Sequence, residues 1–548
     1  MTTVAVAPVA TGTGGNSPLA GTGQMIRLAL RRDRVMIPLW IVAAVGTVAA
    51  TVSAFKDLYP DAAGRLAFAA SISNSPSLRA LTGVIYDGST IGGLTAWRVS
   101  TIVTTLLGVM SIFVVTRHTR QEEETGRLEL LGSTVLGRRS PLAAAVITMA
   151  AANVVAALLC AAVLIGGGEA ADGSLALGFA MGFGGLVYGC VAALAAQLTE
   201  TSRGANGLAS AVLAAGYVLR AIGDSVDDTG PRWLSWLSPT GWAEEVQAFA
   251  ANRWWVLALM LVVAIALAGV AAVLNQRRDF GASMFAVRPG PAAARPSLRN
   301  SWALAIRLQR GALLGWLVGF LVLGGVYGAI SGGIAELLAS SPQMTQIIQQ
   351  LGGTDALTDA YFAGVLGIIA VVAAAYGISA MLRLRTEETS GRVESVLATP
   401  TRRTTVFGSH LAFALLGPAA LLLGAGLTMG IAANAALADG GSHLGPVLAG
   451  ALVQVPAVWV VTGVAALLVG IAPRFTSAAW GVLAVVMLIG QLGPVLQLPQ
   501  WVMDVSPFTH APKLPGGTVE LLPLVVLVVL AAVLKAAAVW GFRRRDIG

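Results

Sequence analysis

Charged side chains are scarce in this sequence of 548 residues. Asp, Glu, Lys and Arg make up 11% of it, hydrophobic residues make up 56%, and the mean hydropathy is +0.77. A soluble protein of this length would need far more charge to cover its surface. The scarcity therefore excludes a soluble globular protein and predicts an integral membrane protein.

Cysteine and histidine are also rare, which excludes most metal and nucleophile chemistry. The two cysteines, Cys160 and Cys190, lie in apolar segments, where a small buried side chain is far more common than a disulfide or a metal ligand. The four histidines are scattered, at His118, His410, His443 and His510. No His-Glu-x-x-His motif and no Ser/His/Asp grouping is present. The sequence predicts neither a metal site nor an enzyme.

Lysine occurs only at Lys56, Lys513 and Lys535. A phosphate-binding loop requires Gly-Lys-Ser or Gly-Lys-Thr, and none of these lysines follows a glycine. We therefore expect no nucleotide site in this chain and no cofactor bound by it.

Long apolar segments are what the chain has in abundance. Each is about 20 residues long, enough to cross a bilayer as a helix. We expect about twelve spans, near residues 35–55, 97–116, 141–166, 174–198, 205–223, 254–275, 311–331, 362–382, 407–433, 444–472, 477–497 and 519–541. The predicted fold class is an all-α polytopic membrane protein.

The net charge of +8 and the pI near 10 come almost entirely from arginines beside these segments. They are Arg27, Arg31, Arg32 and Arg34 before the first span, Arg117, Arg120, Arg138 and Arg139 after the second, and Arg277 and Arg278 after the sixth. Arginines that flank a span mark its cytoplasmic end. The basic charge therefore indicates how the spans are oriented in the membrane, and it does not indicate nucleic-acid binding. With an even number of spans, both termini are expected in the cytoplasm of a bacterium, on a multi-pass plasma-membrane protein.

One charged sequence occurs twice, each time directly after an apolar segment. The first charged repeat, residues 120–129, reads Arg-x-Glu-Glu-x-Thr-Gly-Arg-Leu-Glu, and the second charged repeat, residues 385–394, reads Arg-x-Glu-Glu-x-Ser-Gly-Arg-Val-Glu. Charge this dense does not enter lipid. Each copy is therefore expected to form a polar surface beside the membrane.

Other markers recur at nearly the same spacing. Residues 28–34 return at 304–310, Trp233 with Ser238-Pro239 returns as Trp501 with Ser506-Pro507, and Arg277-Arg278-Asp279 returns as Arg544-Arg545-Asp546. A duplication explains the series, and the same cytoplasmic start makes the two halves a parallel repeat. We expect a disordered tail at 1–24 that is no signal peptide, a six-helix half at 25–280, a cytoplasmic linker at 281–300 and a second six-helix half at 301–548. Each half should begin with an interfacial helix.

The spacing of charges within the repeats predicts helical contacts. A glutamate precedes an arginine by four residues, the spacing of an ion pair, in Glu123 with Arg127 and in Glu388 with Arg392. Two further glutamates stand seven residues apart, on one helix face, in Glu122 with Glu129 and in Glu387 with Glu394. A carboxylate stripe in both copies favours docking of a basic partner over a merely solvated helix. Gly126 and Gly391 are expected to permit a bend or a close backbone approach.

With these features the chain resembles the permease subunits of ABC-2 type exporters, the type V exporter class. The charged repeats, the six-span halves and the Ser-Pro elements match across the chain after residue 24, and the fused form is most similar to actinobacterial exporters of the tetronasin-resistance type. The resemblance implies that each charged repeat is a cytoplasmic coupling helix. It also implies two copies of a separately encoded ATP-binding subunit, which hold ATP and Mg²⁺, and efflux of hydrophobic or amphipathic compounds, antibiotics among them.

Polar residues inside the spans are the candidates for a transport path. Thr101, Thr104 and Thr105 share a face of the second span, and Asn206, Ser210 and Tyr217 share a face of the fifth. The equivalent spans of the second half offer Tyr376, Trp480 and Gln491. For each of them a hydrogen bond to a neighbouring helix is the alternative role. Glu244 and Glu245 stand on a short helix before the sixth span, as a possible exit gate or as solvated charge.

A proton-coupled drug antiporter of twelve spans is the competing class. It would need ionisable residues well inside the spans, and the sequence offers only Arg220 and Lys535, both near span ends. A duplicated charged surface has no role unless a motor docks on it. ATP-driven export is therefore the favoured reading.

Overall fold

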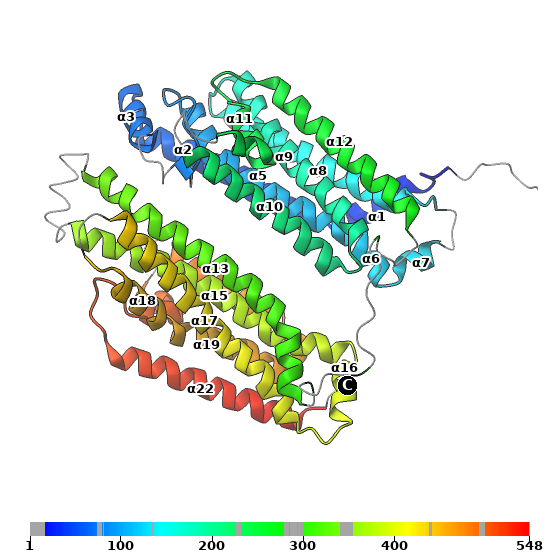
Figure 1. Cartoon of the computed structure of the whole chain (residues 1–548), viewed down its shortest axis with the longest axis vertical. Coiled ribbons are helices and arrows are strands. Elements are labelled where there is room, and N and C mark those ends of the chain that lie inside the picture. The colour runs from blue at the N-terminus through cyan, green and yellow to red at the C-terminus, as the bar shows by residue number, and fades with distance from the viewer. Residues whose placement is uncertain are drawn as a thin grey trace, which may run out of the picture. The chain divides into compact units, whose positions relative to one another are not determined.

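The structure is a computed structural model, and it describes a helical protein (Figure 1). The described residues are 17–73, 79–80, 82–132, 136–225, 232–278, 284, 293, 298, 300–339, 354–437, 441–492 and 499–546. Within these ranges there is no strand, and eleven helices are long and apolar enough to cross a membrane. A shorter apolar helix, Ala478–Gly490, accompanies them. The predicted all-α polytopic fold of about twelve spans is confirmed.

The chain divides into two compact units, residues 1–289 and 290–548. The first contains α1 (Thr22–Arg32), α2 (Met36–Leu58), α3 (Ala62–Ser73), α5 (Ile91–His118), α6 (Arg120–Glu124), α7 (Arg127–Gly132), α8 (Ser140–Gly166), α9 (Ala171–Leu198), α10 (Ser202–Ser225), η1 (Arg232–Leu237), α11 (Pro239–Glu245) and α12 (Trp254–Arg277). The second contains α13 (Ser301–Ala339), α15 (Thr354–Thr389), α16 (Arg392–Leu397), α17 (Arg403–Ala436), α18 (Leu444–Val453), α19 (Val455–Ile471), η3 (Pro473–Phe475), α20 (Ala478–Leu492), α21 (Gln500–Met503), η4 (Pro507–His510) and α22 (Leu521–Arg544).

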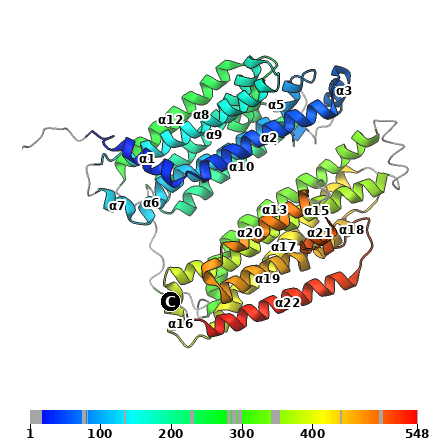
Figure 2. The same ribbon diagram turned by 180° about the vertical axis from the view of Figure 1, so that it is seen from behind.

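Short helices lie at the ends of each unit. In the first unit, α1, α6 and α7 lie at one end and α3 and α11 at the other (Figures 1 and 2). In the second unit, α16 lies at the same end as the last turn of α22. The long helices of each unit run side by side between these ends.

Each unit packs around its own apolar core. The spans α5 and α9 are the most buried of the first unit, and α15 with α18 and α19 of the second, whereas α2, α12, α13 and α22 are mostly exposed. The exposed surfaces carry large apolar side chains such as Val262 and Ile265 of α12 and Val525 and Val526 of α22. Such surfaces suit contact with lipid, because a helix satisfies its own backbone groups there.

Glycines bring two helices of the second unit into close contact. A Cβ atom at Gly324, Gly328 or Gly332 of α13 would lie 2.2–2.5 Å from backbone oxygens of α17. These glycines are four residues apart and therefore line one face of α13. Close backbone approach through small residues is how helices associate in lipid, where apolar burial gives little driving force between them.

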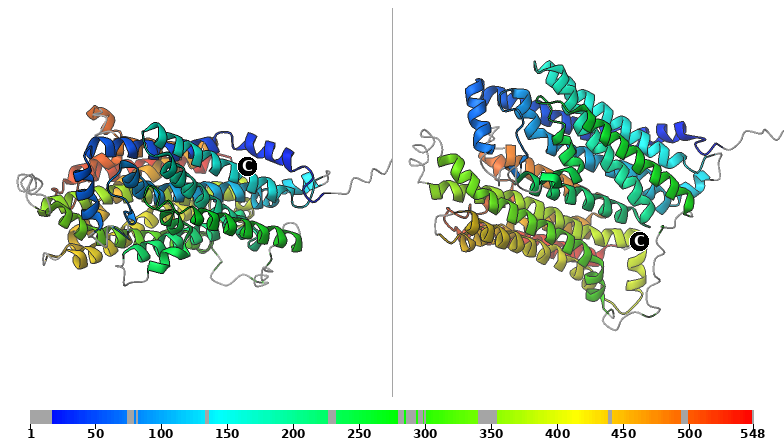
Figure 3. Two further views of the ribbon diagram at one scale, coloured as in Figure 1. Left: turned by 90° about the horizontal axis from the view of Figure 1, so that it is seen from above. Right: turned by 45° about the horizontal axis from the view of Figure 1, so that its top comes forward.

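The two halves begin differently, which corrects one prediction. In the first half the expected interfacial helix is α1, and a break at residues 33–35 separates it from α2. In the second half there is no such break: α13 is continuous from Ser301, although its first turns bend away from the rest of the helix (Figures 1 and 3). Pro38 favours the break, because its ring disfavours a continuous helix through residue 34, and Leu314 stands at the matching position.

Three other segments differ from expectation or fall outside the described residues. Helix α1 begins at Thr22, inside the predicted tail, and the carbonyl oxygen of Pro18 accepts a hydrogen bond of 3.0 Å from the Arg139 N–H. Residues 1–16 and most of the predicted linker lie outside the described residues. The eleventh predicted span is described only as α20, whose 15 residues extend about 22 Å and are too short to cross the hydrocarbon.

Candidate functional site

Each charged repeat is a helix, a left-handed glycine and a short second helix. In the first, α6 ends at Glu124 and α7 begins at Arg127; in the second, α15 runs to Thr389 and α16 begins at Arg392. Gly126 and Gly391 both have φ of +71°, a conformation that side-chain-bearing residues rarely adopt. A Cβ atom would meet nothing within 4 Å at either position, so glycine is required for the bend and not for close approach.

The bend makes one sequence prediction wrong. Glu123 and Arg127 do not pair across one helix turn, because the left-handed glycine between them ends the helix. The Arg127 guanidinium instead lies 3.7 Å from the Glu122 carboxylate. In the second repeat Arg392 lies 2.6 Å from Glu387, not beside Glu388.

The predicted carboxylate stripe is also wrong, for the same reason. Glu122 and Glu387 are buried, with 5% and 6% of their surface exposed, whereas Glu129 and Glu394 are exposed on α7 and α16. Arg127 and Arg392 are exposed as well. Each repeat therefore presents the arginine and the last glutamate of its second helix outward, and keeps its paired glutamates inside the unit; the first repeat also exposes Glu124.

The buried glutamates are held by arginines that the sequence reading did not connect to them. The Glu123 carboxylate lies 2.5 Å from Arg120 and receives two hydrogen bonds from Arg278, just after α12. The Glu388 carboxylate lies 2.9 Å from Arg385 and is bonded by Arg545, just after α22. Arg278 and Arg545 both belong to the recurring Arg-Arg-Asp element. That recurrence is the sequence feature that could have pointed to these contacts.

Further ion pairs join α1 and the break after it to the first charged repeat and to the end of α5. The Glu122 carboxylate accepts a hydrogen bond from Arg32, the last residue of α1. The fully buried Asp33, in the break between α1 and α2, lies 2.8 Å from Arg117 and 2.5 Å from the His118 ring. In the second unit Gln309 takes the place of Asp33 and lies 3.0 Å from His410. The break before α2 is thus tied to the end of α5.

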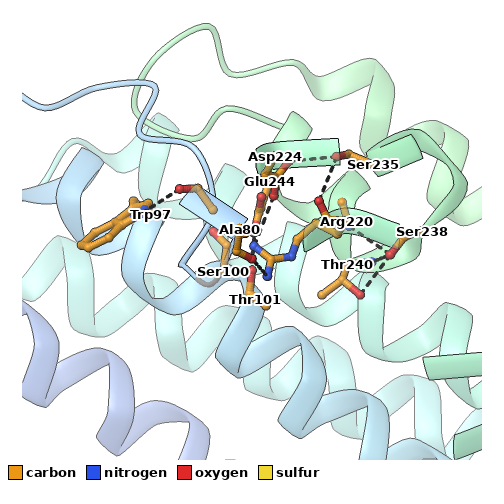
Figure 4. Close-up of polar contacts among 12 residues, drawn as sticks. Ala80, Trp97, Ser100, Thr101, Arg220, Asp224, Ser235, Ser238, Thr240 and Glu244 are labelled. Atoms are coloured by element: carbon orange, nitrogen blue, oxygen red, sulfur yellow. Dashed lines mark hydrogen bonds and ion pairs between the residues drawn. The ribbon is translucent and has the colours of Figure 1, made fainter. Parts of the chain in front are cut away.

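A second polar cluster lies at the opposite end of the first unit, around α11 (Figure 4). Arg220 is fully buried, and its guanidinium lies 3.2 Å from Asp224 and 3.3 Å from Glu244. Thr101 of α5 donates a hydrogen bond to Glu244, and Ser235 donates one of 2.8 Å to Asp224. We call these five residues the Arg220 cluster.

Glu244 and Glu245, the predicted exit gate, are both buried, so the alternative of solvated charge is wrong. Burial raises the pKa of Glu244, and Arg220 offsets this only in part. Glu245 lies 2.9 Å from Arg253 and accepts a hydrogen bond of 3.1 Å from Tyr86. A cavity of about 20 Å³ beside Glu244 is large enough for a water molecule and too small for a drug.

The predicted path residues of the first unit mostly pack against their own unit. Thr101 belongs to the Arg220 cluster, and a Cβ atom on Gly184 of α9 would lie 2.4 Å from the Thr104 methyl group. Asn206 accepts a hydrogen bond of 2.5 Å from Thr116, and the Arg220 guanidinium lies 4.8 Å from the Tyr217 ring centre. Thr105 is half-buried and Ser210 is exposed.

The second-unit path residues are not brought together. Tyr376 is buried against Gly417 and lies 5.9 Å, between ring centres, from Trp316. Trp480 is 42% exposed on α20. Gln491 is the penultimate residue of α20, and its side chain lies outside the described part of the structure. The role of these residues in a transport path stays a prediction.

Both cysteines are free and buried, as expected, and no metal-binding cluster occurs among the described residues. The apolar helices, with polar clusters at their ends, define a multi-pass membrane protein.

Comparison with known proteins narrows this class. The family model described as "Multidrug efflux system permease Rv1217c, C-terminal domain" matches residues 23–274 and 298–543. The multidrug efflux system permease protein Rv1217c of Mycobacterium tuberculosis is 40% identical over 532 residues, which cover 97% of this chain and 96% of that protein. The chain therefore belongs to the family of Rv1217c-like multidrug efflux permeases.

Proposed function

We propose that this chain is the permease subunit of an ATP-driven exporter of the ABC-2 type. In this proposal the ATP-binding subunit is separately encoded and present in two copies, which bind ATP and Mg²⁺. The permease contributes the path and the transmission of force, and is not itself an enzyme. It lies in a bacterial plasma membrane with both termini in the cytoplasm and exports hydrophobic or amphipathic compounds, including antibiotics of the polyketide class.

One observation carries the proposal: the same bent, charged element occurs in both halves and presents the same two residues outward. Arg127 with Glu129 on α7, and Arg392 with Glu394 on α16, are exposed. Two like surfaces suit two copies of one partner. The sequence also has no Gly-Lys-Ser or Gly-Lys-Thr of its own, so an ATP-driven mechanism requires that partner.

The proposed mechanism follows from the position of these surfaces at the ends of long helices. Closure of the two ATP-binding subunits moves α7 and α16, and each of these is one glycine away from a helix that leads into the core of its half. Movement of α5 and α15 then shifts the halves between inward-open and outward-open states. ATP contributes through its higher affinity for one of these states.

The test is a double charge reversal, Glu129→Arg with Glu394→Arg, in the purified permease reconstituted with the ATPase that co-purifies with it. Loss of both outward carboxylates should weaken docking and lower substrate-stimulated ATP hydrolysis by about tenfold or more, the equivalent of about 1.4 kcal/mol. Each single reversal should harm less than the double change, because one intact surface remains.

Glu520→Arg is the matched control, since Glu520 is an exposed glutamate that precedes α22 and lies outside both charged repeats. It should leave ATP hydrolysis unchanged. If the double reversal also leaves coupling unchanged, the charged repeats are not the docking sites. If no ATPase co-purifies at all, the proposal of ATP-driven export fails as a whole.

A proton-coupled antiporter remains the second candidate, and the Arg220 cluster favours it. Here one buried arginine faces two carboxylates, one of them in the last turn of α10, so the cluster can carry a proton. The two candidates differ in their energy source. Transport in vesicles that stops with a protonophore, and persists without ATP, would favour the antiporter.

A further inference from the structure

The structure joins two elements that are far apart in the sequence, and it does so in both halves. The first arginine junction consists of Arg120, Glu123, Arg138 and Arg278. The Arg278 guanidinium donates a hydrogen bond of 2.7 Å to Glu123, and Arg138 donates one of 2.5 Å to the carbonyl oxygen of Arg278. The residues joined are 140 and 155 positions apart.

The second arginine junction repeats this arrangement with Arg385, Glu388, Arg403 and Arg545. The Arg545 guanidinium donates to Glu388, and Arg403 donates a hydrogen bond of 2.9 Å to the carbonyl oxygen of Arg545. Each member is the repeat counterpart of a member of the first junction. Within each half, therefore, one arginine binds the backbone carbonyl oxygen of the arginine after the last span, while a glutamate of the charged repeat binds the side chain of that arginine.

The ion pairs of Glu123 with Arg278 and of Glu388 with Arg545 are largely shielded from water, whereas Arg138 and Arg403 are exposed. Arg278 is 5% exposed and the side chains of Glu123 and Glu388 are 6% and 3% exposed. Breaking a buried ion pair leaves a charge without its partner, so the pair resists separation. Arg278 also donates a hydrogen bond of 2.7 Å to Gln197 at the end of α9. The helix ends that meet in each junction must move together.

We propose that Arg278 and Arg545 are positioning residues that connect the charged repeats to the last spans, α12 and α22. Motion of α7 or α16 then reaches two spans of its half directly: the helix that leads into the repeat, and the last span through the arginine junction. This inference rests on the proposed docking of an ATP-binding subunit at the charged repeats. It adds a second connection, which the chain order alone does not provide.

The test compares Arg278→Gln and Arg545→Gln, singly and together, with Arg277→Gln and Arg544→Gln. The control arginines are the neighbours in the same duplicated element, and both are exposed. In the full-length permease alone, Arg278→Gln should speed amide hydrogen exchange in α7 by about tenfold or more, because the buried ion pair between Arg278 and Glu123 is lost. The control variants should not change it.

In the reconstituted complex, the same variants should still bind the ATPase but lose substrate stimulation of ATP hydrolysis. A double-mutant cycle sharpens the assignment: Glu123→Gln with Arg278→Gln should cost no more stimulation than either change alone, because the two residues act through one contact. Arg278→Lys should recover only part, since lysine cannot bond both carboxylate oxygens and Gln197 in a fixed fork.

Three outcomes would overturn the inference. One is unchanged exchange in α7 of Arg278→Gln, and another is strictly additive loss in the cycle. The third is equal loss in the exposed control variants. The exchange measurement needs no ATPase, so a faster-exchanging α7 in a permease that binds no ATPase would support the junction and reject the proposed function.

Discussion

Neighbouring glutamates of the charged repeats have different surroundings and therefore different roles. Glu122 and Glu123 are buried against arginines, whereas Glu129, one helix further along, is exposed. A guanidinium at hydrogen-bond distance offsets part of the cost of burying a carboxylate. The inner glutamates hold the repeat to its unit, and only the outer residues remain for contact with a partner.

Glu244 differs from these glutamates, because the effect of burial on its pKa outweighs the effect of the neighbouring arginine. Glu244 is buried and shares Arg220 with Asp224. Its pKa is raised to about 8, mainly by burial. A raised pKa means that the folded protein holds the proton more tightly than the unfolded chain does. Stability from this group is therefore complete at low pH and is lost as the pH rises toward 8.

We accordingly expect the heat-unfolding midpoint of the purified permease to fall between pH 5.5 and pH 8, by the equivalent of about 1–3 kcal/mol. Glu244→Gln should remove this decrease, because glutamine resembles the protonated carboxyl group at every pH. The measurement is thermal unfolding in lipid nanodiscs at both pH values.

Glu520→Gln serves as the control, since Glu520 is exposed and should leave the pH dependence as it is. A pH dependence that survives in Glu244→Gln would place the titrating group elsewhere.

At the scale of elements, a single glycine sets the direction of each short helix. Without the left-handed residue, α6 would continue through Arg127 and place Glu129 on the face of Glu122, as the sequence reading assumed. The bend instead turns α7 away and separates exposed from buried charge. The same holds for α16 and Gly391.

Gly126→Ala and Gly391→Ala should therefore each cost about 1–2 kcal/mol of local conformational stability, the penalty of a left-handed alanine. No clash adds to it, because the space is open. We expect unchanged expression and impaired coupling, measured as loss of substrate-stimulated ATP hydrolysis. Gly408→Ala is the control: it lies in open space within α17 and should be neutral or stabilising by up to about 1 kcal/mol. Equal effects in all three variants would contradict the role of the bend.

The spans could be predicted from sequence because hydropathy and length decide them locally. Observed bounds such as Trp254–Arg277 and Ser140–Gly166 lie within about two residues of the predicted spans. The break before α2 could also have been found, since Pro38 disfavours a continuous helix and the second half has a leucine at the matching position. The similarity of residues 28–34 and 304–310 led to the prediction of the same helix break in both halves, although the nearby proline occurs in only one of them.

The site could be predicted only in part. Repetition identified the charged repeats and the Arg-Arg-Asp elements, but nothing in either one says that Glu123 binds Arg278, 155 positions away. Tertiary packing decides such contacts. The Arg220 cluster was missed for a related reason: Arg220 and Glu244 were read separately, as a span-end residue and a gate residue.

At the scale of the whole molecule, each unit has a complete apolar core of its own. The arginine junctions close within one unit, and so does the Arg220 cluster. Each half thus has the contacts that a folding unit requires.

Residues 1–289 and 290–548, produced as two separate chains in one cell, should therefore each insert into the membrane and together restore efflux to at least about a tenth of that of the intact chain. The measurement is drug accumulation in cells that express either half or both. Either half alone should be inactive. Restored efflux with one half would show that the second is dispensable, and no insertion of either half would show that folding requires the covalent connection.

The Arg220 cluster bears on how the duplicated halves have diverged. Where the first half has Thr101, Glu244 and Glu245, the repeat spacing places Leu366, Pro512 and Lys513 in the second. The arginine junctions, by contrast, are kept in both. One end of the ancestral unit has thus stayed under the same constraint in both copies, while the other end was free to specialise. Replacing the first half with a second copy of the second half would therefore preserve the junctions and lose the buried charge, whereas the reverse replacement would duplicate it.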